Sequence, residues 1–251
     1  MLTLQNDQLT VEILDPRSDR DRLGARYCAG GYIFQITDLQ VGPLLSGPTY
    51  PTSFNTFDGQ GIPDSFALAP ISSAQQGHEV VLGVGVCDAA DGALLDPAVW
   101  DVEEQQKSIV FETRPEHEGG TVDVRRRVSL EGRTVQSRTL VHNAGGGRFR
   151  MVWFPHPFFP QLPAGADDLI KISIPVAGAT NEAYEMVPSG FIRRLGWPWS
   201  GGHYQPLDLL GGGELVITQR HPLLGQVSAA CHWTPTYFPC GGIRTRSHGN
   251  R

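Results

Sequence analysis

The sequence has few charged residues and no long apolar run. Of its 251 residues, 18% are charged, the formal net charge is −6, and the basic residues are scattered except for Arg125-Arg126-Arg127. Proteins that bind nucleic acid through its phosphates present a basic face, so we do not expect nucleic acid as a partner. No stretch approaches the length of a membrane span, and residues 1–7 lack the basic and apolar regions of a secretion signal. We therefore expect a cytoplasmic protein with no membrane partner.

Cysteine is scarce and widely spaced. Cys28, Cys87, Cys231 and Cys240 contain no Cys-x-x-Cys pair. Because zinc and redox sites usually use such short spacings, we expect free buried thiols, no bound metal and no cofactor.

Helical periodicity is also missing, since no segment of ten or more residues repeats apolar side chains at helical spacing. Glycine and proline, at 30 and 19 residues, exceed average usage, which favours many short strands joined by tight turns. No break in composition divides the chain, and all-β domains of this length are common. The sequence therefore predicts a single all-β domain over residues 1–251, built of antiparallel strands.

Alternation of apolar and polar residues locates these strands. An opening hairpin turns at Asn6-Asp7, with Leu9, Val11 and Ile13 on one face of its second strand. The arginine run lies within a similar alternation, which predicts a strand with a solvated arginine face. After residue 79 the expected strands are 80–86, 108–113, 121–130, 134–142, 149–154, 214–218 and 225–231.

One histidine stands out because prolines flank it on both sides. The apolar residues 149–154 lead into Pro155-His156-Pro157, and two phenylalanines follow. Proline fixes its own φ and disfavours helix in the preceding residue, so the backbone around His156 is rigid. A proton donor must be held within hydrogen-bond distance of its acceptor, which this rigidity favours. A structural histidine at a strand end explains the same residues equally well.

The segment His156-Pro157-Phe158-Phe159 resembles a motif of the aldose 1-epimerase, or galactose mutarotase-like, superfamily. There, a histidine followed by aromatic residues closes a strand in mid-chain and protonates the ring oxygen of the sugar. Residues 140–145 (Leu-Val-His-Asn-Ala-Gly) are similar to the family's strand end just upstream. The resemblance implies a large antiparallel β-sandwich of the mutarotase-like type, a cofactor-free sugar site and His156 as the general acid.

Four further residues are candidates for sugar binding by their place in this pattern. Asp64 lies in a loop similar to the one that covers the family's sugar site, and His78 precedes the next strand. Asp208 falls near an acidic residue of the relatives. His203 belongs to residues 197–204, whose tryptophans and glycines suit stacking against a sugar ring. A turn role competes for Asp64, and aromatic loops also serve as lids over a core.

The catalytic base that the family would supply is missing. In the superfamily, a glutamate near the C-terminus removes the proton of the anomeric hydroxyl. The chain resembles its relatives through residues 233–239, but residues 240–251 contain no carboxylate. Read in another frame from the last base of the Cys240 codon, this tail can encode the Ser-Arg-Glu-Pro segment that the family predicts. Our hypothesis is that the tail is frame-shifted, which resequencing the gene would test.

The sequence thus predicts an isomerase that resembles aldose 1-epimerase and interconverts the anomers of a hexose, or of a hexose phosphate, at C1. The expected partner is this small sugar; Arg193-Arg194 could meet a phosphate, although we expect these arginines on the surface. A non-catalytic carbohydrate-binding protein is the alternative, because the glutamate is absent. Another sugar transformation is the third candidate, since one fold hosts many reactions.

Overall fold

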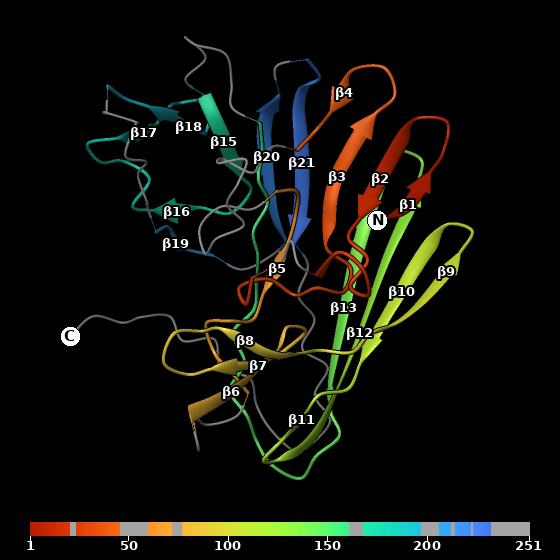
Figure 1. The fold of residues 1–251 in the computed structure, drawn as a ribbon. Coiled ribbons are helices and arrows are strands. Elements are labelled where there is room, and N and C mark those ends of the chain that lie inside the picture. Colours follow the sequence, from red (N-terminus) through yellow and green to blue (C-terminus); the bar gives the residue numbers. More distant parts are fainter. Residues whose placement is uncertain are drawn as a thin grey trace, which may run out of the picture. The chain divides into compact units, whose positions relative to one another are not determined.

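The structure is a computed structural model that describes the chain except for residues 21–23, 46–59, 72–76, 161–167, 197–205, 212–213, 222 and 232–251. The described residues form antiparallel strands joined by turns, which confirms the predicted all-β class (Figure 1). No helix among them is long and apolar enough to cross a membrane. The chain divides into two compact units, an N-terminal unit (Met1–Phe159) and a C-terminal unit (Pro160–Arg251). The single domain expected from composition stays a prediction.

The N-terminal unit contains antiparallel sheets that share its core. β1 to β4 pair in chain order, as do β6 to β8, while β5 pairs with β14. In the remaining sheet β12 lies between β10 and β13, with β9 beyond β10 and β11 beside the start of β12. The strands are β1 (Leu2–Gln5), β2 (Leu9–Ile13), β3 (Ile33–Asp38), β4 (Gly42–Pro43), β5 (Asp64–Ser65), β6 (His78–Val81), β7 (Gly85–Asp88), β8 (Leu94–Pro97), β9 (Asp101–Gln105), β10 (Ser108–Thr113), β11 (Glu116–His117), β12 (Gly120–Glu131), β13 (Thr134–Asn143) and β14 (Phe154–Pro155).

The opening hairpin forms as predicted. The Asn6 side chain accepts hydrogen bonds from the amides of Gln8 and Leu9, which fixes the turn between β1 and β2. Its amide nitrogen donates to the carbonyl of Gly132, in the turn between β12 and β13, at 2.7 Å. The alternate residues of β2 that the sequence placed on one face are all buried. This hairpin is therefore tied to the turn of a second sheet.

β12 shows the predicted alternation over its whole length. Val122, Val124, Val128 and Leu130 are buried, and the polar residues between them are more exposed. Because successive side chains of a strand point to opposite faces, one face of β12 belongs to the core. Arg126 occupies the inward register and is buried with the valines. The predicted strand and its solvated face are confirmed, since Arg125 and Arg127 are exposed, whereas Arg126 lies on the buried face.

Two predicted strands differ from the observed ones. Residues 80–86 form the ends of two antiparallel strands, β6 and β7, because Gly83 adopts a φ of 71° and the chain turns there. A positive φ suits glycine, which has no Cβ to clash. Of residues 149–154 only Phe154 belongs to a strand, and this strand, β14, pairs with β5 rather than with the preceding β13. The prediction of a meander is therefore wrong at this point.

The C-terminal unit contains one larger sheet, in the order β17-β18-β15-β20-β21, and the small pair β16–β19. The predicted pairing of residues 214–218 with 225–231 is confirmed by the antiparallel pair β20 and β21. The strands are β15 (Asp168–Ile172), β16 (Val176–Ala177), β17 (Tyr184–Met186), β18 (Phe191–Arg194), β19 (Asp208–Leu209), β20 (Leu215–His221) and β21 (Gly225–Cys231).

The thiols follow expectation where they are described. Cys28 and Cys87 are free and buried, and Cys231 is free and half-buried. Burial raises the pKa of all three thiols above its ordinary value, because the thiolate is poorly solvated there. Cys240 lies outside the described residues.

Phe111 in β10 provides a test of the core. Its side chain is 0% exposed, so Phe111→Ala is expected to lower the free energy of unfolding by about 3–5 kcal/mol through lost burial and an unfilled cavity. The neighbouring Glu112→Ala removes an exposed carboxylate paired with Arg125 and is expected to cost less than about 1 kcal/mol. Urea denaturation followed by circular dichroism measures both, and equal losses would contradict the burial of Phe111.

Candidate functional site

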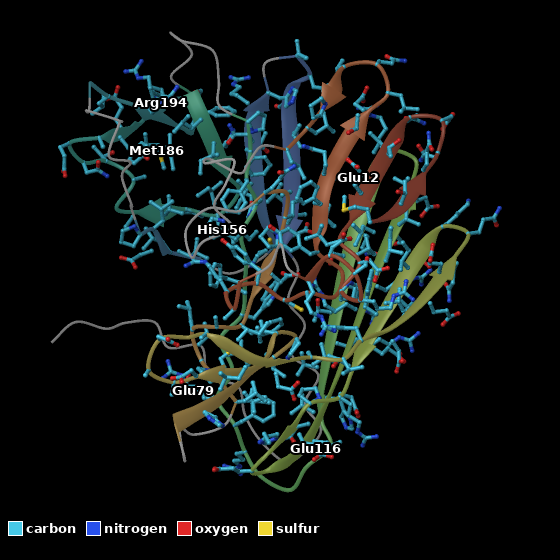
Figure 2. The ribbon with its side chains drawn as sticks, viewed as in Figure 1. Glu12, Glu79, Glu116, His156, Met186 and Arg194 are labelled. Atoms are coloured by element: carbon cyan, nitrogen blue, oxygen red, sulfur yellow. The ribbon has the colours of Figure 1, made fainter. Side chains whose placement is uncertain are left out.

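Backbone hydrogen bonds fix the segment that carries His156. β14 pairs with β5, which sets Pro155 opposite Asp64. The amide of His156 then donates to the carbonyl of Pro63 at 2.8 Å, and the amide of Phe158 donates to the carbonyl of Gly61 at 2.8 Å. The predicted rigidity around the histidine therefore has two sources, the flanking prolines and a bonded neighbouring segment. Figure 2 labels His156.

Aromatic side chains surround the imidazole of His156. The ring of Phe158 stacks on it with centroids 4.4 Å apart and planes 19° apart. The ring of Tyr27 meets it edge-on at 6.1 Å, and that of Phe154 lies tilted at 6.0 Å. Tyr27 in turn contacts Tyr32 edge-on, within a buried cluster that Phe158 also packs against. His156 is thus a half-buried imidazole at the margin of an aromatic cluster.

This environment changes the acidity of His156. Burial lowers its pKa from the ordinary value of 6.5, and the positive charge of Arg26 lowers it further, while a backbone hydrogen bond opposes the shift. Both causes disfavour the charged imidazolium. The imidazole is therefore neutral at pH 7, and its protonated form is a stronger acid than an ordinary histidine.

Asp64 lies in the interior of the N-terminal unit. It is 6% exposed, and its Oδ2 forms an ion pair with Nη2 of Arg126. Its Oδ1 accepts a hydrogen bond from Nε1 of Trp153 at 2.9 Å. Both carboxylate oxygens therefore have protein partners. A direct contact between Asp64 and a sugar stays a prediction, and these contacts favour a supporting role.

Arg126 is the residue of this region that sequence reasoning missed. Besides Asp64, its guanidinium donates to the carbonyl of Gly30 at 2.6 Å, to Oγ1 of Thr139 at 3.0 Å and to Oγ of Ser137 at 3.2 Å. The side chain is 0% exposed. Its inward register among the valines of β12 was the available signal, because a charged residue in a buried register needs a partner.

His78 and Asp208, two further predicted sugar contacts, lie on strands of their own, and His203 lies outside the described residues. His78 is the first residue of β6 and is exposed. Figure 2 shows Glu79, its neighbour in β6, in a different region from His156. Asp208 is exposed in β19, where it pairs with Ala177 in the C-terminal unit. Within the N-terminal unit, the pairing of β5 with β14 brings the backbone around His156 beside Asp64.

The described part of the chain contains no cluster of side chains that could hold a metal ion. No group of three or more His, Cys, Asp or Glu side chains lies close enough there to hold a metal ion. What this region offers is a positioned imidazole, aromatic faces and the nearby charge of Arg26.

Comparison with known proteins gives two solved structures. No protein-family model and no curated protein matches the sequence. One structure is a galactose mutarotase related enzyme from Lactobacillus acidophilus, 12% identical, with a TM-score of 0.48 over 90% of this chain and 79% of that one. The other is a galactose mutarotase-like protein from Lactobacillus casei ATCC 334, 13% identical, with a TM-score of 0.46 over 91% of this chain and 81% of that one.

The lowered pKa of His156 predicts a pH dependence of stability. Below pH 6.5 the unfolded chain takes up a proton that the folded protein does not, so the free energy of unfolding falls as pH falls from 6.5 towards the folded pKa. His156→Gln cannot titrate, so its stability is expected to fall less over this range. Urea denaturation at intervals between pH 8 and pH 5 measures the difference, with pH 8 as the reference for effects unrelated to protonation. Parallel curves for the two proteins would contradict the shift.

Proposed function

We propose that this protein binds a hexose, free or phosphorylated, beside His156 and interconverts its anomers at C1. His156 donates a proton to the ring oxygen while solvent water takes the proton of the anomeric hydroxyl, so that the bond between C1 and the ring oxygen breaks and the open-chain aldehyde forms. Rotation about the C1–C2 bond and the reverse proton transfers then reclose the ring with either configuration. The observation that carries the proposal is an imidazole that stacks on Phe158 and stands on a fixed backbone, since the His156 amide donates to the Pro63 carbonyl. The resemblance of residues 156–159 to the mutarotase motif supports the choice of reaction.

The aromatic neighbours suit a sugar ligand. The apolar face of a pyranose stacks on aromatic rings, and Phe154, Phe158 and His156 are all half-buried rather than enclosed. A half-buried imidazole retains some access to a ligand and is still partly shielded from water. Electrostatic interactions and proton transfers gain strength where water is excluded. A sugar bound beside His156 would therefore meet both aromatic rings to stack against and a proton donor.

Binding without catalysis is the second candidate. Mutarotation needs a proton acceptor at the anomeric hydroxyl as well as a donor at the ring oxygen. Asp64, which lies opposite Pro155 in the β5–β14 pair, already accepts hydrogen bonds on both oxygens and is buried. This arrangement makes Asp64 a poor acceptor and favours a carbohydrate-binding protein that turns over slowly or not at all.

Polarimetry separates these functions. We expect the protein to accelerate the loss of optical rotation of freshly dissolved α-glucose or α-galactose. His156→Gln is expected to lower kcat by about 10²–10⁴, the usual contribution of a positioned acid. The matched control is His142→Gln, which removes an exposed histidine paired with Asp123 in the same unit. Acceleration that survives in His156→Gln would rule out the proton-donor role.

Binding is measured alongside the rate. Titration of each sugar by calorimetry, and of its 6-phosphate as a separate ligand, shows which form binds. Heat of binding without any acceleration supports the carbohydrate-binding protein. Neither binding nor acceleration with any hexose would reject both candidates.

The pH profile tests the protonation state that acts. If His156 is the donor, kcat/KM is expected to fall about tenfold per pH unit above the pKa of the imidazole, which lies below 6.5. The uncatalysed rate is subtracted at each pH. A rate that rises with pH through this range would show that neutral His156 is the active form and would contradict its role as a general acid.

A further inference from the structure

We infer that Arg126 is a positioning residue, which through Asp64 and the carbonyl of Gly30 fixes the two segments that face His156. This inference rests on the proposed function, since it concerns the same histidine. Arg126 is distant from His156 in sequence and has no contact with its ring among the interactions described above. It acts through Asp64 and the carbonyl of Gly30.

The first segment is the one that carries His156. Asp64 receives the charge of Arg126 on Oδ2 and the indole N–H of Trp153 on Oδ1. Trp153 directly precedes β14, and the backbone of Asp64 pairs with Pro155 within the β5–β14 pair. The chain is therefore held to Asp64 at two of the three positions before His156, Trp153 and Pro155. Rotation of the Asp64 carboxylate would release one of these contacts.

The second segment, residues 26–30, also faces the imidazole. It supplies Arg26, whose charge acts on His156, and Tyr27, whose ring meets it edge-on. Three hydrogen bonds fix this segment: the carbonyl of Gly30 accepts from Arg126, the amide of Cys28 donates to the carbonyl of Asp64, and the carbonyl of Arg26 accepts from the Ser65 hydroxyl. Arg126 thus holds this segment directly and again through β5.

The geometry requires arginine rather than a generic cation. The guanidinium presents a planar set of donors, and here they reach Asp64, the Gly30 carbonyl and the hydroxyls of Ser137 and Thr139. A lysine ammonium is a compact donor group on a flexible stem and cannot reproduce the spread of these partners. Lysine keeps the charge that Asp64 needs while releasing some of the other contacts, so Arg126→Lys tests position separately from charge.

The experiment compares Arg126→Lys with Arg127→Lys, the same change at the exposed neighbour in β12. Mutarotation gives kcat and KM for each, and NMR titration of the imidazole gives the pKa of His156 in the unliganded protein. We expect Arg126→Lys to lower kcat by about 10- to 100-fold with KM changed less than about threefold, since small misplacements of a catalytic group cost this much. We also expect its His156 pKa to move up towards 6.5, while Arg127→Lys matches the wild type.

A merely structural role gives a different result. Arg126→Lys would then unfold at a lower temperature, yet at 25 °C, where it remains folded, its kcat and His156 pKa would equal those of the wild type. That outcome overturns the inference. If Arg126→Lys does not fold, Trp153→Phe removes the indole hydrogen bond to Asp64 while keeping an aromatic ring, and is expected to shift both readouts in the same direction by a smaller amount. Unchanged readouts in this variant also overturn the inference.

The two proposals fail separately. A wild-type protein that accelerates no mutarotation rejects the catalytic function, and the NMR titration alone then decides whether Arg126 positions His156. An active wild type with an Arg126→Lys variant of equal kcat and equal His156 pKa rejects the positioning role alone.

Discussion

The ion pair between Arg126 and Asp64 is the constraint on which the N-terminal unit depends. A guanidinium removed from water is tolerated only where a carboxylate and further acceptors replace its hydration, and here Asp64, Gly30, Ser137 and Thr139 do so. Loss of one partner from such a buried pair typically costs about 3–5 kcal/mol, because the other charge is left uncompensated. The segments that provide these acceptors therefore cannot move independently of β12. The buried charge of Arg126 thus gives a defined position to the irregular segments that carry Gly30 and Asp64.

The same packing gives His156 its chemical character. Tyr27 and Phe158 shield the imidazole from water, and Arg26 adds a positive charge nearby, so the contacts that fix the ring also keep it neutral at pH 7. A neutral imidazole costs less to bury than an imidazolium. Position and acidity are consequently linked, since any change that loosens the segments around the ring also lets water reach it. A lowered pKa makes the imidazolium of His156 a stronger acid, but it also reduces the fraction of molecules in which His156 is protonated at a given pH.

Local patterns in the sequence predicted most strands and the hairpins between neighbouring strands, but not the partners that lie far along the chain. The alternation in β12 and the turn at Asn6 depend on neighbouring residues, and both were found correctly. Gly83 was read as part of a strand because an isolated glycine gives no sign of a positive φ. The pairing of β14 with β5 depends on residues almost ninety positions apart, as does the hydrogen bond between Trp153 and Asp64. Arg126 stood in the inward register, yet its charge argued for solvent until its partner was known.

The site could be predicted to a similar extent. His156 was found because its flanking prolines are a local signal of rigidity, whereas the burial of Asp64 is a property of the tertiary structure. An aspartate in a loop rich in glycine and proline is usually exposed, so a ligand contact was the natural expectation. With Asp64 engaged by Arg126 and Trp153, a donor at His156 still requires an acceptor elsewhere for full mutarotation. A positioned acid alone contributes about 10²–10⁴ in rate, so sugar binding and weak anomer exchange are two degrees of one arrangement.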